Sequence, residues 1–322
     1  MRCVVTSIAF GVLTLFGAGC CHVRESTARR EPAPVPSVIA AQVRYTNHPA
    51  TAPDITEIGR HRRFTIHRVH LPAVAEPHAT NRLLELDYYR PHGTNPLAVV
   101  VVLPILGGGY PAEKHFCAYF ARHGLAAILV RREGLRKTIT RLEEVNDTLL
   151  HSAIDARQAI DWIETRPELD AGRIGVFGIS MGGIRAAFLT PLEPRIRAAV
   201  IALAGGDLPF VITHSNEPGL VRRREKFRET HQLTEAAFQE EVQKVITCDP
   251  LSVAAGADRS KLLLVQALFD RTVPTRKGLE LRRALGKPET IFLPTGHYTS
   301  LLFIPYLKPA SLQFFHERFA DR

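Results

Sequence analysis

The pentapeptide Gly-Ile-Ser-Met-Gly at residues 178–182 has the composition and setting of a nucleophile turn. Residues 173–177 have the pattern of a strand, and the residues after Gly182 have that of a helix. A tight turn between them would leave the serine hydroxyl exposed, and the flanking glycines would let neighbouring backbones pass closely. The first amides of the helix would favour negative charge developing nearby. The pattern therefore predicts a nucleophilic serine at Ser180.

Two later strands end in residues that could complete this chemistry. Residues 261–268 run into Phe-Asp-Arg-Thr-Val-Pro, which contains Asp270. Residues 290–293 run into Pro-Thr-Gly-His-Tyr, which contains His297. A nucleophilic serine requires a base, and the base in turn requires a group that orients it.

The order of serine, acid and histidine, each after its own strand, resembles that of the α/β-hydrolase superfamily. The chain from about residue 60 onward is similar to its esterase, lipase and dienelactone-hydrolase members. The resemblance implies Ser180 as nucleophile, Asp270 as acid and His297 as base. Because some members place the acid one strand earlier, Asp207 stays as the alternative acid. No His, Asp or Glu cluster has metal-ligand spacing, so neither a metal nor another cofactor is expected.

This family also uses two backbone amides to hold an oxyanion. Met181, which follows the nucleophile, occupies the position of the first. Residues 104–110, Pro-Ile-Leu-Gly-Gly-Gly-Tyr, resemble the His-Gly-x-x-Gly loop of the family but lack its histidine and first glycine. Aligned with that pattern, Leu106 supplies the second amide, and Ile105 is the alternative donor.

The rest of the chain has the pattern of an α/β scaffold. Short β-rich runs alternate with helical patterns, which is typical of a mostly parallel sheet flanked by helices. We predict an α/β-hydrolase fold with a central, mostly parallel eight-stranded sheet. The expected strands are residues 63–71, 83–89, 97–103, 126–130, 173–177, 198–203, 261–268 and 290–293, with helices at 112–123 and 144–165. The polar insertion at 207–247 is too long for an ordinary connection and is expected to form a helical cap.

The N-terminus has the pattern of an export signal. An apolar run within residues 1–19 follows Arg2, and Leu-Phe-Gly-Ala-Gly-Cys at residues 15–20 resembles a bacterial lipobox. That resemblance implies lipid attachment at Cys20, with the protein on a bacterial membrane facing the periplasm or the exterior. An ordinary cleaved signal and an uncleaved apolar anchor remain alternatives. Polar, proline-bearing residues 20–59 are interpreted as a tether to a body at residues 60–322.

Composition excludes several function classes. The chain is 45% hydrophobic and 23% charged, as in a globular protein. Its net charge of +9 is scattered, and no nucleic-acid-binding motif accompanies it, so we expect no nucleic acid partner. The excess charge favours a membrane surface or an anionic substrate. Cys117 and Cys248 could form a bridge or remain two free thiols.

These features predict a serine hydrolase that cleaves the carboxylic ester of a small molecule or lipid through an acyl-enzyme. An acyltransferase or a peptidase of the same fold would share every residue named above. A catalytically silent surface-binding protein is the alternative outside the enzymes.

Overall fold

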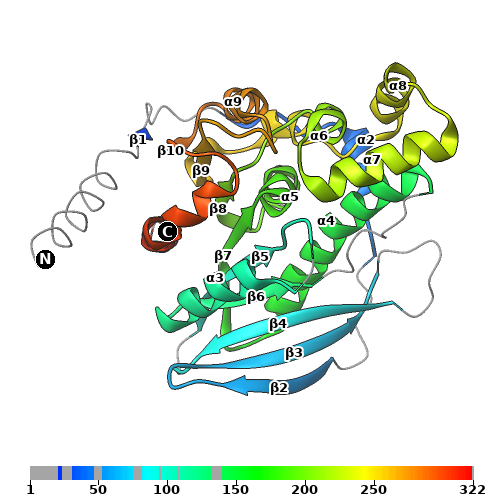
Figure 1. Cartoon of the computed structure of the whole chain (residues 1–322). Helices are drawn as coiled ribbons and strands as arrows, with labels where there is room; N and C mark the ends of the chain where they lie inside the picture. The colour runs from blue at the N-terminus through cyan, green and yellow to red at the C-terminus, as the bar shows by residue number, and fades with distance from the viewer. Residues whose placement is uncertain are drawn as a thin grey trace, which may run out of the picture.

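The computed structural model describes residues 21–23, 31–46, 53–74, 82–93, 96–107, 109–131 and 140–320. One ten-stranded sheet in the order β1-β10-β9-β8-β7-β5-β6-β4-β3-β2 runs through this part of the chain (Figure 1). The strands are β1 (Cys21–Val23), β2 (Asp54–Arg60), β3 (Phe64–Pro72), β4 (Leu83–Pro91), β5 (Leu97–Leu103), β6 (Ala126–Val130), β7 (Leu169–Ile179), β8 (Ile196–Ala202), β9 (Leu262–Ala267) and β10 (Glu289–Leu293).

The six strands β5 to β10 are parallel, whereas β1 to β4 are attached antiparallel. All eight expected strands are present, and the predicted number is corrected to ten by β1 and β2 at the two edges. β1 has only three residues, and nearly every residue of β2 is exposed. Neither strand therefore carries the apolar pattern by which a strand is recognised.

Helices cover both faces of the sheet. Val100 and Val102 of β5 point to the face covered by α3 (Pro111–Arg122) and α10 (Ile304–Ala320). Val99 and Val101 point to the opposite face. That face is covered by α4 (Leu142–Glu164), α5 (Met181–Leu189) and α9 (Thr275–Ala284). Because β5 is buried on both faces, it is a continuous run of apolar residues.

Short 3₁₀ turns complete the connections. They are η1 (Thr190–Leu192), η2 (Pro250–Ser252), η3 (Ala254–Gly256), η4 (Arg259–Lys261) and η5 (Thr299–Phe303). No helix among the described residues combines the length and the apolar character needed to cross a bilayer.

Residues 31–46 differ from the extended tether expected there. They form α2 (Ser37–Gln42) and pack on the body, where the Ala33 N–H donates to the Ala255 carbonyl at 2.8 Å. Val43 is 1% exposed, and its carbonyl accepts a 2.8 Å hydrogen bond from Arg157. The prolines of this stretch suggested an extended course, but Val35, Ile39 and Val43 provide apolar contacts that hold it against the core.

Cys117 and Cys248 are both buried and free. They belong to the core clusters on opposite faces of the sheet, so the bridge that their sequence positions allowed does not form. Burial raises the pKa of both thiols, which keeps them protonated and unreactive.

The insertion at residues 207–247 contains three helices, α6 (Leu208–His214), α7 (Pro218–His231) and α8 (Glu235–Val245). Phe227 of α7 and Phe238 of α8 are buried against each other, with ring centroids 5.8 Å apart. In Figure 1 the three helices (yellow-green) lie at the upper right of the molecule. We refer to them as the cap.

Asp249 is hydrogen-bonded to the start of the cap. Its carboxylate accepts hydrogen bonds from the backbone N–H groups of Asp207, Leu208 and Leu251 at 3.2, 2.7 and 2.8 Å. Partial burial raises the pKa of this carboxyl group.

Replacing Asp249 by alanine is expected to lower the free energy of unfolding by about 3 kcal/mol, because three amides lose their acceptor. Asp249→Asn keeps one acceptor oxygen and should cost less. Urea denaturation of the three proteins measures the difference. Equal stability of Asp249→Ala and the parent would contradict this account of the cap.

Candidate active site

Ser180 lies in the turn between β7 and α5, with backbone angles φ 55° and ψ −122°. A positive φ is unfavourable for any residue other than glycine, so the surrounding structure must hold this conformation. The Ser180 N–H donates to the Ala202 carbonyl of β8 at 2.8 Å. The Ser180 carbonyl accepts from the Ile184 N–H at 2.9 Å, which is the first helical bond of α5.

Gly178 and Gly182 allow this turn because no side chain fits at either position. A Cβ on Gly178 would lie 2.1 Å from the Gly182 carbonyl oxygen, and one on Gly182 would lie 2.2 Å from the Leu103 carbonyl oxygen. Both distances are shorter than atomic contact permits. The two glycines of the pentapeptide are therefore required by packing, and α5 begins directly against the end of β5.

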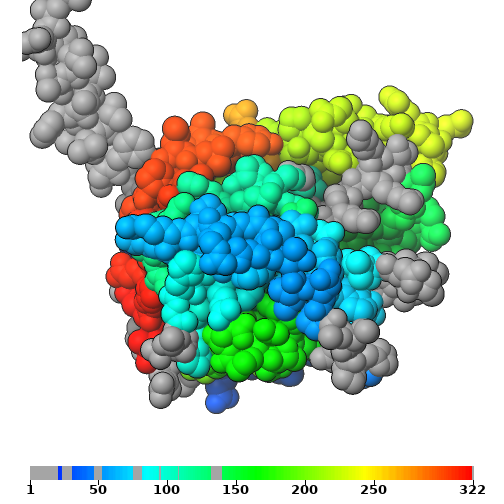
Figure 2. Space-filling view, turned by 90° about the horizontal axis from the view of Figure 1, so that it is seen from below, coloured from blue at the N-terminus to red at the C-terminus, as the bar shows by residue number. Residues whose placement is uncertain are grey.

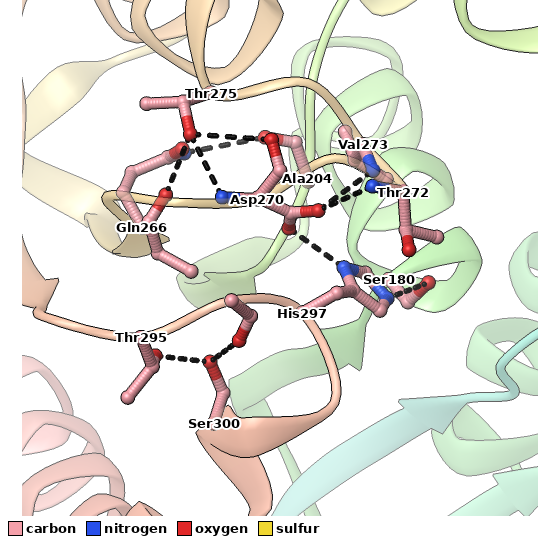
Figure 3. Close-up of polar contacts among 12 residues, drawn as sticks. Ser180, Ala204, Gln266, Asp270, Thr272, Val273, Thr275, Thr295, His297 and Ser300 are labelled. Carbon is pink, nitrogen blue, oxygen red and sulfur yellow. Dashed lines mark hydrogen bonds and ion pairs between the residues drawn. The ribbon is translucent and has the colours of Figure 1, made fainter. Parts of the chain in front are cut away.

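Ser180, His297 and Asp270 form a continuous chain of hydrogen bonds (Figure 3). His297 Nε2 is 2.9 Å from Ser180 Oγ, and His297 Nδ1 is 2.7 Å from Asp270 Oδ2. The side chain of Asp270 is only 3% exposed, and that of His297 9%. The second carboxylate oxygen of Asp270 accepts from the Thr272 and Val273 N–H groups at 2.8 and 2.9 Å, so the acid is held from both sides.

Hydroxyl groups fix the two loops that carry the acid and the base. Thr275 Oγ1 donates to the Ala267 carbonyl and accepts from the Asp270 N–H, both at 3.0 Å. Ser300 Oγ lies 2.7 Å from Thr295 Oγ1 and donates to the Gly296 carbonyl at 2.9 Å (Figure 3). Sequence analysis missed these residues, because threonine and serine near a loop carry no distinguishing pattern.

Asp207, the alternative acid, lies elsewhere in the fold. Its carboxylate caps α6 by accepting from the Phe210 N–H at 3.1 Å, and it pairs with Lys277 Nζ at 2.5 Å. It has left-handed backbone angles at the start of the cap. Of the two candidate acids, Asp270 is therefore the one that contacts His297.

The loop after β5 lies beside the nucleophile turn. Arg185 of α5 donates from Nη1 to the Pro104 carbonyl at 3.4 Å. The Ile105 N–H donates to Glu113 Oε1 at 2.7 Å, so this amide already has a partner. Among the described residues, no hydrogen bond occupies the Leu106 N–H. The Met181 N–H belongs to the first turn of α5, where amides have no partner within the helix.

Glu113 is a second residue that sequence analysis missed. It is 3% exposed in the first turn of α3, where the helix dipole favours a carboxylate. An acidic residue in a first helical turn is too common to indicate a role in the neighbouring loop.

The cap contacts the acid loop directly. Thr272 Oγ1 donates to Asn216 Oδ1 of the α6–α7 connection at 2.9 Å. In the described part of the chain, no three His, Cys, Asp or Glu side chains gather as a metal site would need. Cys20, the predicted lipid attachment site, lies outside the described residues.

Comparison with known proteins gives a family match over half of the chain. The model of the family X-Pro dipeptidyl-peptidase (S15 family) matches residues 81–245. Two Mycobacterium tuberculosis proteins, both named as uncharacterized, are each 27% identical over 157 residues. That match covers 48% of this chain but only 35% of theirs.

Solved structures resemble the chain over most of its length. An acetyl xylan esterase from Paenibacillus sp. R4 has a TM-score of 0.67 at 19% identity, covering 87% of this chain and 91% of that one. Acetyl xylan esterase 1 from Thermoanaerobacterium sp. has a TM-score of 0.62 at 16% identity, covering 88% and 92%. At these identities the likeness shows the shared fold.

Proposed function

Because the chain belongs to the X-Pro dipeptidyl-peptidase S15 family, an α/β-hydrolase family, and is thus a hydrolase of that fold, we propose that it cleaves carboxylic esters through an acyl-enzyme on Ser180. The observation that carries this proposal is the hydrogen-bond chain from Ser180 through His297 to Asp270. Such a chain gives a serine hydroxyl a base, and gives that base a fixed orientation.

In the first step, Ser180 Oγ attacks the carbonyl carbon of the ester while His297 Nε2 takes the hydroxyl proton. Asp270, already fixed by two backbone amides, accepts the proton on His297 Nδ1 in a hydrogen bond and stabilises the resulting cation. Collapse of the tetrahedral intermediate transfers the proton from His297 to the leaving alcohol. In the second step, His297 Nε2 takes a proton from water as the water oxygen attacks the acyl carbon. Collapse of this second tetrahedral intermediate breaks the bond to Ser180 Oγ, which takes the proton back from His297, and the carboxylic acid is released.

The oxyanion of both intermediates needs two aligned amides. Met181 and Leu106 are the proposed donors. Ile105 is the poorer candidate, because its N–H already donates to Glu113.

Replacing Glu113 by alanine tests the positioning of this loop. The Ile105 N–H would lose its acceptor, and we expect kcat to fall about 10-fold to 100-fold, a part of what losing a whole oxyanion donor costs. Glu113→Gln keeps an acceptor oxygen and should retain most of the activity. Initial rates on p-nitrophenyl acetate compare the two. Equal losses of kcat in Glu113→Ala and Glu113→Gln would instead show that the negative charge of Glu113 matters, rather than its acceptor oxygen.

Esters are favoured over peptides because the acetyl xylan esterases match this chain across nearly their whole length. A panel of p-nitrophenyl esters from acetate to laurate tests the substrate class. The panel should be combined with a fluorophosphonate probe and peptide mapping. Labelling at Ser180 with turnover of at least one ester is expected, and labelling at another serine would overturn the assignment.

The family name supplies a second candidate, removal of an N-terminal dipeptide that ends in proline. Ala-Pro-p-nitroanilide and its N-acetylated form separate this activity from ester cleavage. A dipeptidyl-peptidase would cleave the free form and reject the acetylated one, whereas an esterase should be slow on both. An acyltransferase would reveal itself by a new ester product when an alcohol acceptor is added.

We further propose that Cys20 carries a lipid that holds the protein on a bacterial membrane, as the lipobox pattern of residues 15–20 predicts. Intact mass of the membrane-extracted protein tests this directly. The expected mass corresponds to a chain that begins at Cys20 and carries acyl groups, and an unmodified N-terminus would contradict it.

A further inference from the structure

Exposed apolar side chains gather beside the loops of Asp270 and His297. Ten large apolar side chains are exposed among the described residues, and six of them lie between residues 268 and 306. We call these six the rim patch: Leu268, Phe269, Tyr298, Leu301, Leu302 and Tyr306. Phe269 is 68% exposed and Leu302 63%, which is unusual for side chains of this size.

Backbone hydrogen bonds hold the two loops of the rim patch side by side. The Leu268 N–H donates to the Leu293 carbonyl and the Phe269 N–H to the Thr295 carbonyl, both at 2.9 Å. The Leu301 N–H donates to the Tyr298 carbonyl at 3.2 Å. Asp270 and His297 belong to the same two loops, so the rim patch borders the candidate active site.

The segment of the rim patch that follows β10 has no acidic residue. Residues 290–310 include a single Lys, Lys308, and no Asp, Glu or Arg. Arg271, two residues after Phe269 in the loop of Asp270, is exposed. The apolar rim patch is thus accompanied by Arg271 and Lys308, and the segment after β10 has no carboxylate. Such a surface suits a bilayer in which anionic headgroups lie above acyl chains. Figure 2 shows residues near 300 (orange-red) and the cap (yellow-green) along one edge of the molecule.

The first described strand pairs with the strand that leads into the loop of His297. β1 runs antiparallel to β10, with Cys21 opposite Phe292 (Figure 1). The carboxyl end of β10 leads into the loop of His297, so Cys21 lies at the end of β1 nearest that loop. Cys20 lies outside the described residues and directly precedes Cys21 in the chain. A lipid on Cys20 would therefore enter the membrane beside the rim patch.

We propose that the rim patch rests on a lipid bilayer, so that the candidate active site opens toward the membrane. Its substrate is then an acyl ester in the bilayer or at its surface. The orientation rests on the rim patch and the position of β1, and it stands independently of whether Ser180 hydrolyses esters.

Tryptophan placed on the rim patch reports this contact. The sole native tryptophan, Trp162, is 5% exposed. Leu302→Trp places an indole on the rim patch. Ile58→Trp, at a 48% exposed site on β2, is the matched control because β2 is the opposite edge strand of the sheet. The full chain is incorporated into vesicles of phosphatidylcholine and phosphatidylglycerol, with and without brominated acyl chains, and emission is compared.

We expect brominated lipid to quench the emission of Leu302→Trp by about half and to leave that of Ile58→Trp unchanged. Absence of quenching in both, or equal quenching in both, would overturn the proposal. A concentration-dependent dimer, seen by light scattering without vesicles and lost in Leu301→Ser/Leu302→Ser, would assign the rim patch to a second copy and also overturn it.

Partitioning provides a second measurement. Leu301→Ser/Leu302→Ser should bind vesicles at least tenfold less well than Ile58→Ser when lipidation is prevented by Cys20→Ser, because two exposed leucines that would enter the bilayer are lost. Turnover of water-soluble p-nitrophenyl acetate should stay at the parent level, which verifies folding. Equal binding of the two variants would contradict the proposal.

The quenching experiment can also be made independent of the proposed hydrolysis. Combining Ser180→Ala with Leu302→Trp should leave the quenching unchanged, because membrane contact does not require the nucleophile.

Discussion

Ser180→Ala is expected to lower kcat for ester hydrolysis by about a million-fold, the scale reached when an acyl-transfer nucleophile is lost. The structure supports so large an effect because Ser180 Oγ is the atom that His297 Nε2 contacts, at 2.9 Å. The residual rate would come from direct attack by water that His297 activates, with the oxyanion still stabilised by the two amides. Rates should be measured with active-site titration, so that traces of parent enzyme are not counted.

Ser260→Ala is the matched control for this change. Ser260 lies in η4, before the amino end of β9, and its hydroxyl donates to Asp258. Its removal should leave both turnover and fluorophosphonate labelling intact. Substantial turnover by Ser180→Ala would show that another group performs the chemistry.

Asp270→Asn is expected to lower kcat about ten-thousand-fold while the protein stays folded. The amide oxygen can still accept from the Thr272 and Val273 N–H groups, so the loop keeps its shape. The amide nitrogen would then face His297 Nδ1 and donate to it, which forces the proton onto Nε2 and leaves no base for Ser180. Stopped-flow acylation and circular dichroism together separate this effect from unfolding.

Asp207→Asn serves as the control at the alternative acid. That carboxylate caps α6 and pairs with Lys277, so its neutralisation should change stability slightly and kcat little. A larger loss of kcat in Asp207→Asn than in Asp270→Asn would reverse the assignment made from the geometry.

The sequence predicted the centre of the fold better than its edges. β5 to β10 are buried and apolar, and their ends carry the residues of the candidate site, so pattern and position agree. β1 and β2 could not be recognised, because their pairing depends on partners rather than on an apolar pattern of their own. The packing of residues 31–46 was missed for a similar reason: a few apolar side chains outweigh a proline-rich composition only when a core is present to receive them.

Within the candidate site, the sequence predicted the three side chains that touch one another, but not the groups that orient them. Ser180 stood out because tight packing restricts two neighbouring positions to glycine. Glu113, Thr275 and Ser300 act through contacts with residues 8, 5 and 5 positions away in the chain. Loop contacts of this kind follow neither the helical nor the strand period, so a sequence pattern does not reveal them.

The pairing of β1 with β10 also determines when folding of this protein can be completed during synthesis. His22 and Glu289, in contact at 2.7 Å, are 267 residues apart in the chain, and Ser180 and His297 are separated by 117. Contacts between such distant residues form late, since long loops must close first. A nascent chain without β10 has neither a partner for its first strand nor a base for its serine. Activity would therefore arise only after the last strand has been made, so incomplete chains would carry an inert serine.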